Sequence, residues 1–237
     1  MPPTFLSPVQ LRQLQDDGSV FLPRWHNART TYEIGCLVGH VIDIDTLLPE
    51  GGIPTVQTLQ PRTTSEASNN RYSGVFGLDE FPLHTDLAHW AKPPRYLMLR
   101  CKRGAANVAT TLLPASAVER TVGQTDLRRA LVKPRRPSRS GRTSLLTLSF
   151  FANDIFGLRW DSLFLTPVNP TADRVIREVA GSGKQWPEIR SIFLRSPGDT
   201  VLIDNWRMLH GRGRVTPGST RIIERLYLSE IHYGPGY

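Results

Sequence analysis

Apolar and polar residues alternate over several short segments of the chain, a period typical of β-strands with one buried face. Glycine and proline separate most of these segments. Strands are expected over 20–23, 39–44, 55–59, 96–101, 143–151, 201–203 and 220–228, with a further extended segment over 80–86. Many short strands with few helices indicate a mainly β fold, a jelly-roll (cupin-like double-stranded β-helix) core with flanking α-helices.

Helical spacing of apolar residues predicts helices over 5–17, 114–132 and 170–181. Ser7 is a suitable N-cap for the first helix, and Pro8 fits the first helical position. Thr171 can cap the last helix and Gly181 can end it. The apolar stripe of the middle helix would be Leu127, Ala130 and Leu131.

The chain of 237 residues has no low-complexity linker and no internal repeat, so we expect a single domain over 1–237. No apolar run is long enough to cross a bilayer. The first residues combine neither a basic segment nor an apolar core, so a secretory signal is not expected. Cys36 and Cys101 lie far apart in sequence, which favours free thiols in a reducing cytoplasm over a disulfide.

The net charge of +8 raises nucleic acid as a partner, but the location of the charge matters more than its sum. Five of the basic residues fall within 133–142, a segment rich in proline and serine that reads as a flexible loop. A solvated loop is the simplest interpretation, and we do not expect nucleic acid as a partner. A lid over an anionic substrate and a docking surface for an acidic partner are the alternatives.

His84 and Asp86 lie two residues apart in the extended segment 80–86, so their side chains should leave the same face. A third ligand would complete two histidines and one carboxylate, the set that suits non-haem Fe(II) with open positions. His210 is the candidate, since it follows a turn and a short apolar strand over 197–209. Taken alone, His84 and Asp86 would more simply be a core histidine and a turn carboxylate.

Arg221 follows His210 by eleven positions, and Arg225 follows four later in a predicted strand. Positions an even number apart share a strand face, so both arginines should point the same way. Buried guanidinium groups need anionic partners, and arginine grips carboxylates bidentately. The pair therefore indicates a ligand with a carboxylate.

This ordered set resembles the 2-oxoglutarate-dependent Fe(II) oxygenases of the taurine dioxygenase and clavaminate synthase type. The resemblance covers most of the chain after about residue 70, through the segments 82–86, 159–161 and 198–212. It implies that His84, Asp86 and His210 bind iron and that Arg221 holds the far carboxylate of 2-oxoglutarate. Thr111 is similar to a threonine that also touches this cosubstrate, with Thr110 as the alternative because the usual glycine pair is missing from 108–111.

The resemblance implies an enzyme that uses Fe(II), 2-oxoglutarate and O2 to oxidise a small molecule, with hydroxylation expected, and releases succinate and CO2. Because Asp86 is retained, halogenation is not expected. Arg225 resembles an arginine that meets the substrate's acid group or, in some relatives, the cosubstrate, so an anionic or zwitterionic substrate is expected. Further pocket candidates are Tyr72, Ser73 and Trp206. The alternatives are a metal-binding jelly-roll without oxygenase activity, and a basic β-barrel that binds nucleic acid or an acidic partner.

Overall fold

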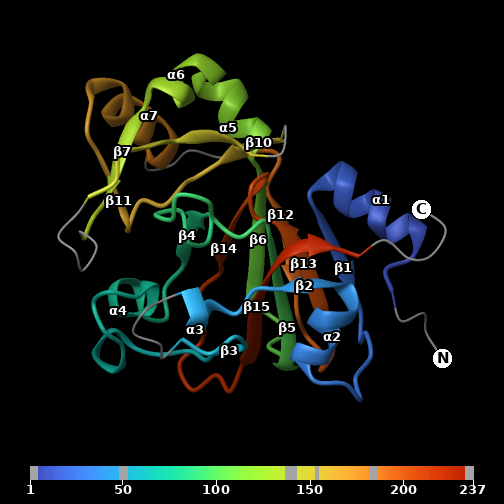
Figure 1. Ribbon diagram of the computed structural model, residues 1–237. Helices are drawn as coiled ribbons and strands as arrows, with labels where there is room; N and C mark the ends of the chain where they lie inside the picture. Colours follow the sequence, from blue (N-terminus) through green and yellow to red (C-terminus); the bar gives the residue numbers. More distant parts are fainter. Residues whose placement is uncertain (1–4, 48–52, 137–142, 153–154, 182–185, 233–237) are drawn as a thin grey trace.

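Two antiparallel β-sheets lie face to face in the computed structural model (Figure 1), which describes residues 5–47, 53–136, 143–152, 155–181 and 186–232. The larger sheet has the order β1 (Ser19–Leu22), β13 (Thr200–Asp204), β5 (Tyr96–Arg103), β15 (Ile222–Ile231) and β2 (Gly39–Val41), and β3 (Gln57–Leu59) also pairs with β15. The smaller sheet has the order β12 (Arg190–Phe193), β6 (Ala109–Pro114), β14 (Met208–Arg212) and β4 (Phe81–His84). The predicted jelly-roll class, mainly β, is confirmed.

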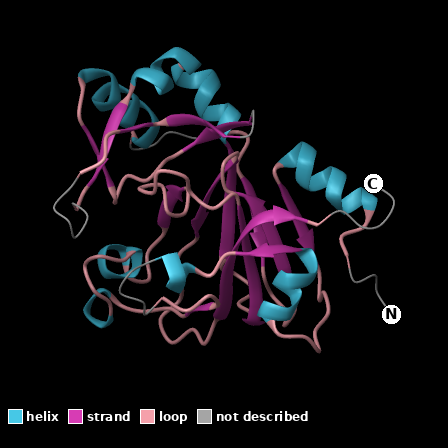
Figure 2. Cartoon of the chain, viewed as in Figure 1, coloured by secondary structure: helices cyan, strands magenta, loops and turns pink. Residues whose placement is uncertain are grey.

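Apolar side chains fill the space between the two sheets. Leu97, Val201 and Tyr227 of the larger sheet pack in one cluster with Leu112 and Met208 of the smaller sheet. The outer face of each sheet is covered by helices (Figure 2). Helices α1 (Pro8–Asp17) and α2 (Thr31–Val38) cover the larger sheet, while α5 (Ala115–Val122), α6 (Gln124–Arg129) and α7 (Pro170–Ala180) cover the smaller one.

Short elements complete the described chain. Two small sheets pack with α5, α6 and α7; one has the order β11 (Leu165–Pro167), β7 (Leu131–Pro134), β8 (Leu146–Thr147), and the other joins β9 (Ser149–Ala152) to β10 (Ile155–Leu158). The remaining elements are α3 (Ile44–Leu47), η1 (Thr64–Glu66) and α4 (Tyr72–Phe76). Among the described residues, no helix is long and apolar enough to cross a bilayer.

The helix prediction for 5–17 is confirmed, with Ser7 as the N-cap and Pro8 as the first helical residue. The helix near 170–181 is also present, but Thr171 is not its cap. The side chain of Asn169 accepts the hydrogen bond from the Ala172 amide, because the helix begins at Pro170, two residues before the start that a Thr171 cap would give. Helix α2 was missed, although Thr30 and Glu33 form a capping box whose pattern is visible in the sequence.

The single helix predicted over 114–132 is wrong. Gly123 adopts φ +84° and separates α5 from α6, and the chain then enters β7 at Leu131. Leu127 is buried as expected, whereas Leu131 pairs with Thr147 of β8. The strand predicted over 143–151 is likewise divided into β8 and β9. Of the expected basic loop, 137–142 lies outside the described residues, and Lys133 belongs to β7.

Three arginines, two buried and one half-buried, donate hydrogen bonds to backbone carbonyls. Arg159 donates to the carbonyls of Ala88, Trp90 and Ala91, which follow the predicted metal motif. Arg212 donates to two carbonyls in the segment 77–79, which precedes this motif. Arg100 serves the loop at 25–26 in the same way. Three of the 29 basic side chains are therefore used inside the molecule.

Replacing Arg100 with methionine should destabilise the protein by about 2–4 kcal/mol. Arg100 is 2% exposed and donates to the carbonyls of Trp25, His26 and Gly198 and to the hydroxyl of Thr200, so its loss removes four hydrogen bonds and leaves the Trp25 carbonyl without a donor. Urea denaturation measures the free energy of unfolding. Arg12→Met, on the exposed face of α1, is the matched control, and equal stability of the two variants would show that the Arg100 hydrogen bonds contribute nothing.

Candidate metal centre

The smaller sheet brings the two candidate histidines together. β14 lies between β4 and β6, and His210 is directly opposite His84 on one side and Leu112 on the other. The two imidazole ring centroids are 4.5 Å apart. Gly211 permits this approach, because a Cβ there would lie 2.7 Å from both the Phe81 carbonyl oxygen and Thr111 Oγ1.

Asp86 lies just beyond the end of β4 and turns its carboxylate towards both histidines. Its Oδ1 is 3.4 Å from Nε2 of His84 and 3.5 Å from Nε2 of His210. One ligand atom from each of the three residues lies within 4.8 Å of the others, and all three residues are buried. The predicted convergence of these residues is present in the structure.

The donor atoms of this triad fit a divalent cation. His84 Nδ1 lies 2.9 Å from the Pro82 carbonyl oxygen, which can only accept a hydrogen bond, so Nδ1 carries the ring proton. In the neutral ring, Nε2 therefore presents a lone pair towards the Asp86 carboxylate. A divalent cation would bind both of these groups, and two imidazoles with one carboxylate are the ligand set of non-haem Fe(II) sites.

Asn205 fixes the backbone of Asp86. The amide of Asp86 donates to Asn205 Oδ1 at 2.7 Å, and Asn205 Nδ2 donates to the carbonyls of Asp86 and Pro94, each at 3.0 Å. Asn205 is fully buried directly after β13. One side chain thus ties the third ligand to the larger sheet.

The second oxygen of the Asp86 carboxylate is held by β15. Oδ2 accepts from Arg225 Nη1 and from the Tyr227 hydroxyl, each at 3.0 Å, and Arg225 Nη2 donates to Gln57 Oε1 at 2.6 Å. Burial opposes ionisation of Asp86, but Arg225 and His210 hold its pKa well below the usual range. Oδ2 is therefore occupied, while Oδ1 is directed between the imidazoles.

Arg225 therefore has a protein carboxylate as its partner. The sequence left the cosubstrate, an acidic substrate group and a distant carboxylate of the chain as alternatives, and the structure contains the third. Arg225 and Tyr227 leave the same face of β15, as the strand period requires. An acid group on the substrate is not needed to neutralise Arg225, so this residue gives no support to an anionic substrate.

Replacing Tyr227 with phenylalanine should weaken metal binding by about 10-fold to 100-fold. The change removes one of the two donors to Asp86 Oδ2 and frees the carboxylate to rotate away from the histidines. Equilibrium titration with Co(II), monitored by visible absorption, measures the affinity without any turnover. Tyr32→Phe, on an exposed side chain, is the control, and identical Co(II) affinities in both variants would contradict a positioning role for Tyr227.

Arg221 is a buried cation without a partner among the described residues. It precedes β15, is 8% exposed, and its Nε has no hydrogen-bond acceptor. Burial lowers its pKa to about 10. A buried guanidinium without an anion is costly, so this position fits the carboxylate of a bound ligand.

Cross-strand pairing distinguishes the two threonine candidates. Thr110 is opposite Arg212 and, two positions before Leu112, lies on the sheet face that carries His210. Thr111 is opposite Gly211, on the other face. The register therefore favours Thr110, the alternative in the sequence, as the threonine that faces the site.

The remaining pocket candidates, Tyr72, Ser73 and Trp206, have different surroundings in the structure. The Tyr72 ring stacks on the His84 imidazole with centroids 4.3 Å apart, so this residue lies at the triad. Ser73 follows it in α4, and its carbonyl accepts from the Gly77 amide. Trp206 is buried edge-on against Phe150 and donates to the Pro93 carbonyl, contacts that account for it by packing.

Asp161 belongs to the site although no role was assigned to it from the sequence. Its Oδ1 accepts a hydrogen bond of 2.9 Å from the Tyr72 hydroxyl. Burial raises the pKa of Asp161, and the adjacent His84 opposes this rise. The signal that could have found Asp161 is its place at the end of the family-like segment 159–161.

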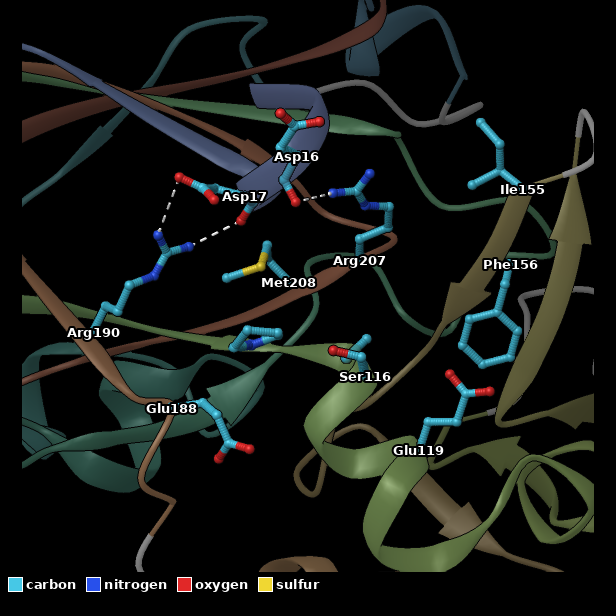
Figure 3. Close-up of a pocket in the computed structure, with 12 residues that line it drawn as sticks. Asp16, Asp17, Ser116, Glu119, Ile155, Phe156, Glu188, Arg190, Arg207 and Met208 are labelled. Carbon is cyan, nitrogen blue, oxygen red and sulfur yellow. Dashed lines mark hydrogen bonds and ion pairs between the residues drawn. The ribbon is translucent and has the colours of Figure 1, made fainter. Parts of the chain in front are cut away.

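A separate surface hollow of about 800 Å³ lies where α1 ends (Figure 3). Arg190 donates to the carbonyl of Asp17, and Arg207 donates to the carbonyls of Gln15 and Asp16. Both arginines therefore cap the last turn of α1. None of the triad residues lines this hollow.

No protein-family model matches the chain. Among solved structures, asparagine oxygenase in complex with Fe(II), 2S,3S-3-hydroxyasparagine and succinate has a TM-score of 0.64 and 18% sequence identity, covering 93% of this chain and 77% of that one. PvcB, described as an Fe, alpha-ketoglutarate dependent oxygenase from an isonitrile synthetic pathway, has a TM-score of 0.62 and 19% identity, covering 96% and 83%. The non-heme iron oxygenase OrfP, with Fe, succinate and (3S)-hydroxy-L-Arg, has a TM-score of 0.61 and 20% identity, covering 94% and 80%. At these identities the similarity establishes a shared fold.

Proposed function

We propose that this protein is a non-haem Fe(II), 2-oxoglutarate-dependent oxygenase that hydroxylates a small, amino-acid-like molecule and releases succinate and CO2. His84, Asp86 and His210 would bind the iron, and Arg221 and Thr110 would bind 2-oxoglutarate. The observation that carries the proposal is the buried triad, whose three ligand atoms lie within 4.8 Å of one another. The shared fold with iron oxygenases supports it.

Bound iron would activate O2, the oxidant, with 2-oxoglutarate as the co-reductant: one oxygen atom would enter the 2-oxo acid as it loses CO2, and the other would enter the substrate. The chain contributes orientation and charge. Arg225 and Tyr227 fix the Asp86 carboxylate, and the unpaired Arg221 offers a charged anchor for a carboxylate. Burial of the triad excludes water, which strengthens each of these electrostatic contacts.

The amino-acid-like substrate is proposed because the structures of two neighbours contain hydroxylated asparagine and hydroxylated arginine. An amino acid is zwitterionic, and the sequence led us to expect an anionic or zwitterionic substrate. We also propose that 1–237 forms one oxygenase domain and that it works in the cytoplasm. The two cysteines support this location, since Cys36 is free and exposed and Cys101 is free and buried.

Anaerobic titration of the metal-free protein with Fe(II) and 2-oxoglutarate tests the proposal. A visible charge-transfer band should develop with one equivalent of each, and O2 should then convert 2-oxoglutarate to succinate. Iron binding without the band or succinate would instead identify a metal-binding jelly-roll without oxygenase activity. Absence of iron binding would leave the binding-module alternative.

A further inference from the structure

Asp161 is a buried carboxylate that forms no salt bridge with a lysine or arginine in the described part of the chain. It is 5% exposed. Its Oδ1 accepts all the hydrogen bonds that the structure gives to this carboxylate, from the Tyr72 hydroxyl at 2.9 Å and from the amides of Leu163 and Phe164 at 2.8 Å each. Oδ2 accepts none from a described residue. Three donors on one oxygen hold the group in place and leave the other oxygen available for a ligand.

The backbone places Asp161 beside the metal-binding segment. The Thr85 amide donates to the Trp160 carbonyl at 2.7 Å, and the Trp160 amide donates to Thr85 Oγ1 at 2.9 Å. Thr85 lies between the two ligands His84 and Asp86. Trp160 is hydrogen-bonded to Thr85, and Asp161 is the next residue after Trp160. The Tyr72 ring, which is hydrogen-bonded to Asp161 and stacked on His84, joins the two from the side.

Two further aromatic rings pack against Tyr72, whose hydroxyl donates to this carboxylate. Tyr72 contacts Phe81 with ring centroids 5.5 Å apart and Phe164 with centroids 5.7 Å apart. Aromatic faces attract cations, and they exclude the water that would otherwise solvate a carboxylate. A protonated amine or guanidinium therefore suits a position beside these aromatic rings better than an anion does.

The neighbouring histidine does not neutralise Asp161. His89 lies near Phe164, with ring centroids 6.1 Å apart, and burial lowers the pKa of His89. Its ring is thus neutral near pH 7, and its Nδ1 has no hydrogen-bond partner in the described structure. His89 can bond to a ligand, but the positive charge must come from elsewhere.

We infer that Asp161 binds a cationic group of the substrate, a protonated amine or guanidinium, beside His84. The inference rests on the proposed oxygenase function and specifies its substrate class. Arg225 is already paired with Asp86. At this position of the described site, the charged residue that can bind the substrate is therefore the acid Asp161. The substrate is therefore recognised through its positive charge.

The test uses the full-length protein loaded with Fe(II) and 2-oxoglutarate, and pairs of compounds that differ in charge. L-arginine is compared with L-citrulline, and L-lysine with Nε-acetyl-L-lysine, each with a free and an N-acetylated α-amine. Succinate release and calorimetric binding are measured. At least one cationic compound should bind and stimulate succinate release, and its neutral partner should be at least about 100-fold less effective in kcat/KM.

Asp161→Asn is the decisive variant, because asparagine keeps an Oδ1 acceptor for Tyr72, Leu163 and Phe164 but removes the charge. It should lower kcat/KM for the cationic compound by about 100-fold or more. The loss should follow the charge of the compound, so kcat/KM for the neutral partner compound should fall far less than kcat/KM for the cationic one. Asp126→Asn, at a half-exposed pair with Arg174, is the control.

Equal activity of neutral and cationic partners would overturn the inference, as would unchanged kcat/KM in Asp161→Asn. So would a panel in which no cationic compound binds or stimulates succinate release. In each of these cases, a band and substrate-free succinate formation in the native protein would leave the oxygenase function standing. Loss of the band in the native protein would remove the oxygenase function itself.

Discussion

Replacement of His84, Asp86 or His210 by alanine should each abolish Fe(II)-dependent succinate formation, a fall of about 1,000-fold or more. Each variant removes one of three ligand atoms that lie within 4.8 Å of one another, and two remaining ligands hold a divalent ion poorly. The fold should persist, because the apolar clusters between and outside the sheets do not depend on these side chains. Succinate assays, bound-iron analysis and circular dichroism measure the three properties.

His40→Ala is the matched control for the triad variants, since this exposed histidine lies on β2 at the edge of the larger sheet. It should retain full iron content and activity. If a triad variant kept iron and near-normal succinate formation, the replaced residue would not be a ligand, and His89, three positions after Asp86, would become the next candidate.

Replacement of Arg221 by alanine should raise the KM for 2-oxoglutarate by about 30-fold to several thousand-fold. Removal of one partner from a partly buried, charge-assisted pair costs about 2–5 kcal/mol, and each 1.4 kcal/mol is a factor of ten. Arg221 touches no ligand atom of the triad in any contact of the described structure, so Fe(II) affinity without the cosubstrate should change little. The KM and the Fe(II) affinity are measured separately.

Arg225→Gln is the informative comparison for Arg221. Arg225 holds Asp86 Oδ2, so its loss should weaken metal binding even without 2-oxoglutarate. The two variants are therefore distinguished by the affinity that changes: 2-oxoglutarate affinity in Arg221→Ala and metal affinity in Arg225→Gln. Unchanged 2-oxoglutarate affinity in Arg221→Ala would show that Arg221 is not the carboxylate anchor.

The triad could be predicted from the sequence because its members are marked by short-range spacing and by recognisable local motifs. His84 and Asp86 are two positions apart, and His210 follows a recognisable turn and strand. Arg225 and Tyr227 share a face as the strand period predicts, whereas Arg221 precedes β15 and a register shift separates Ile222 from Ile223. What the sequence did not contain was the pairing between distant strands, which determines whether Thr110 or Thr111 faces the site.

Long-range contacts explain the other differences. Arg225 and Asp86 are 139 positions apart, so the partner of this arginine could not be chosen from spacing. Asp161 meets Tyr72 across 89 positions for the same reason. Helix ends were misplaced where a glycine with positive φ, at position 123, interrupts a continuous apolar pattern.

Composition was a weaker guide than location. The net charge of +8 is compatible with a nucleic-acid binder, yet Arg100, Arg159 and Arg212 donate to internal carbonyls. Guanidinium groups that are used in this way cannot contact phosphate. The charge balance of a chain rich in arginine therefore says little about partners until the internal acceptors are known.

Asn205 determines the order in which the protein assembles. The hydrogen bonds of its side-chain amide fix the Asp86 backbone to the end of β13, and these bonds need no metal. Folding should therefore come first and iron second, unlike in zinc fingers, where the ion drives folding. A chelator should remove the iron and leave slow hydrogen exchange at the Asp86 amide unchanged, so the protein can lose and regain its metal in the cell without passing through an unfolded state.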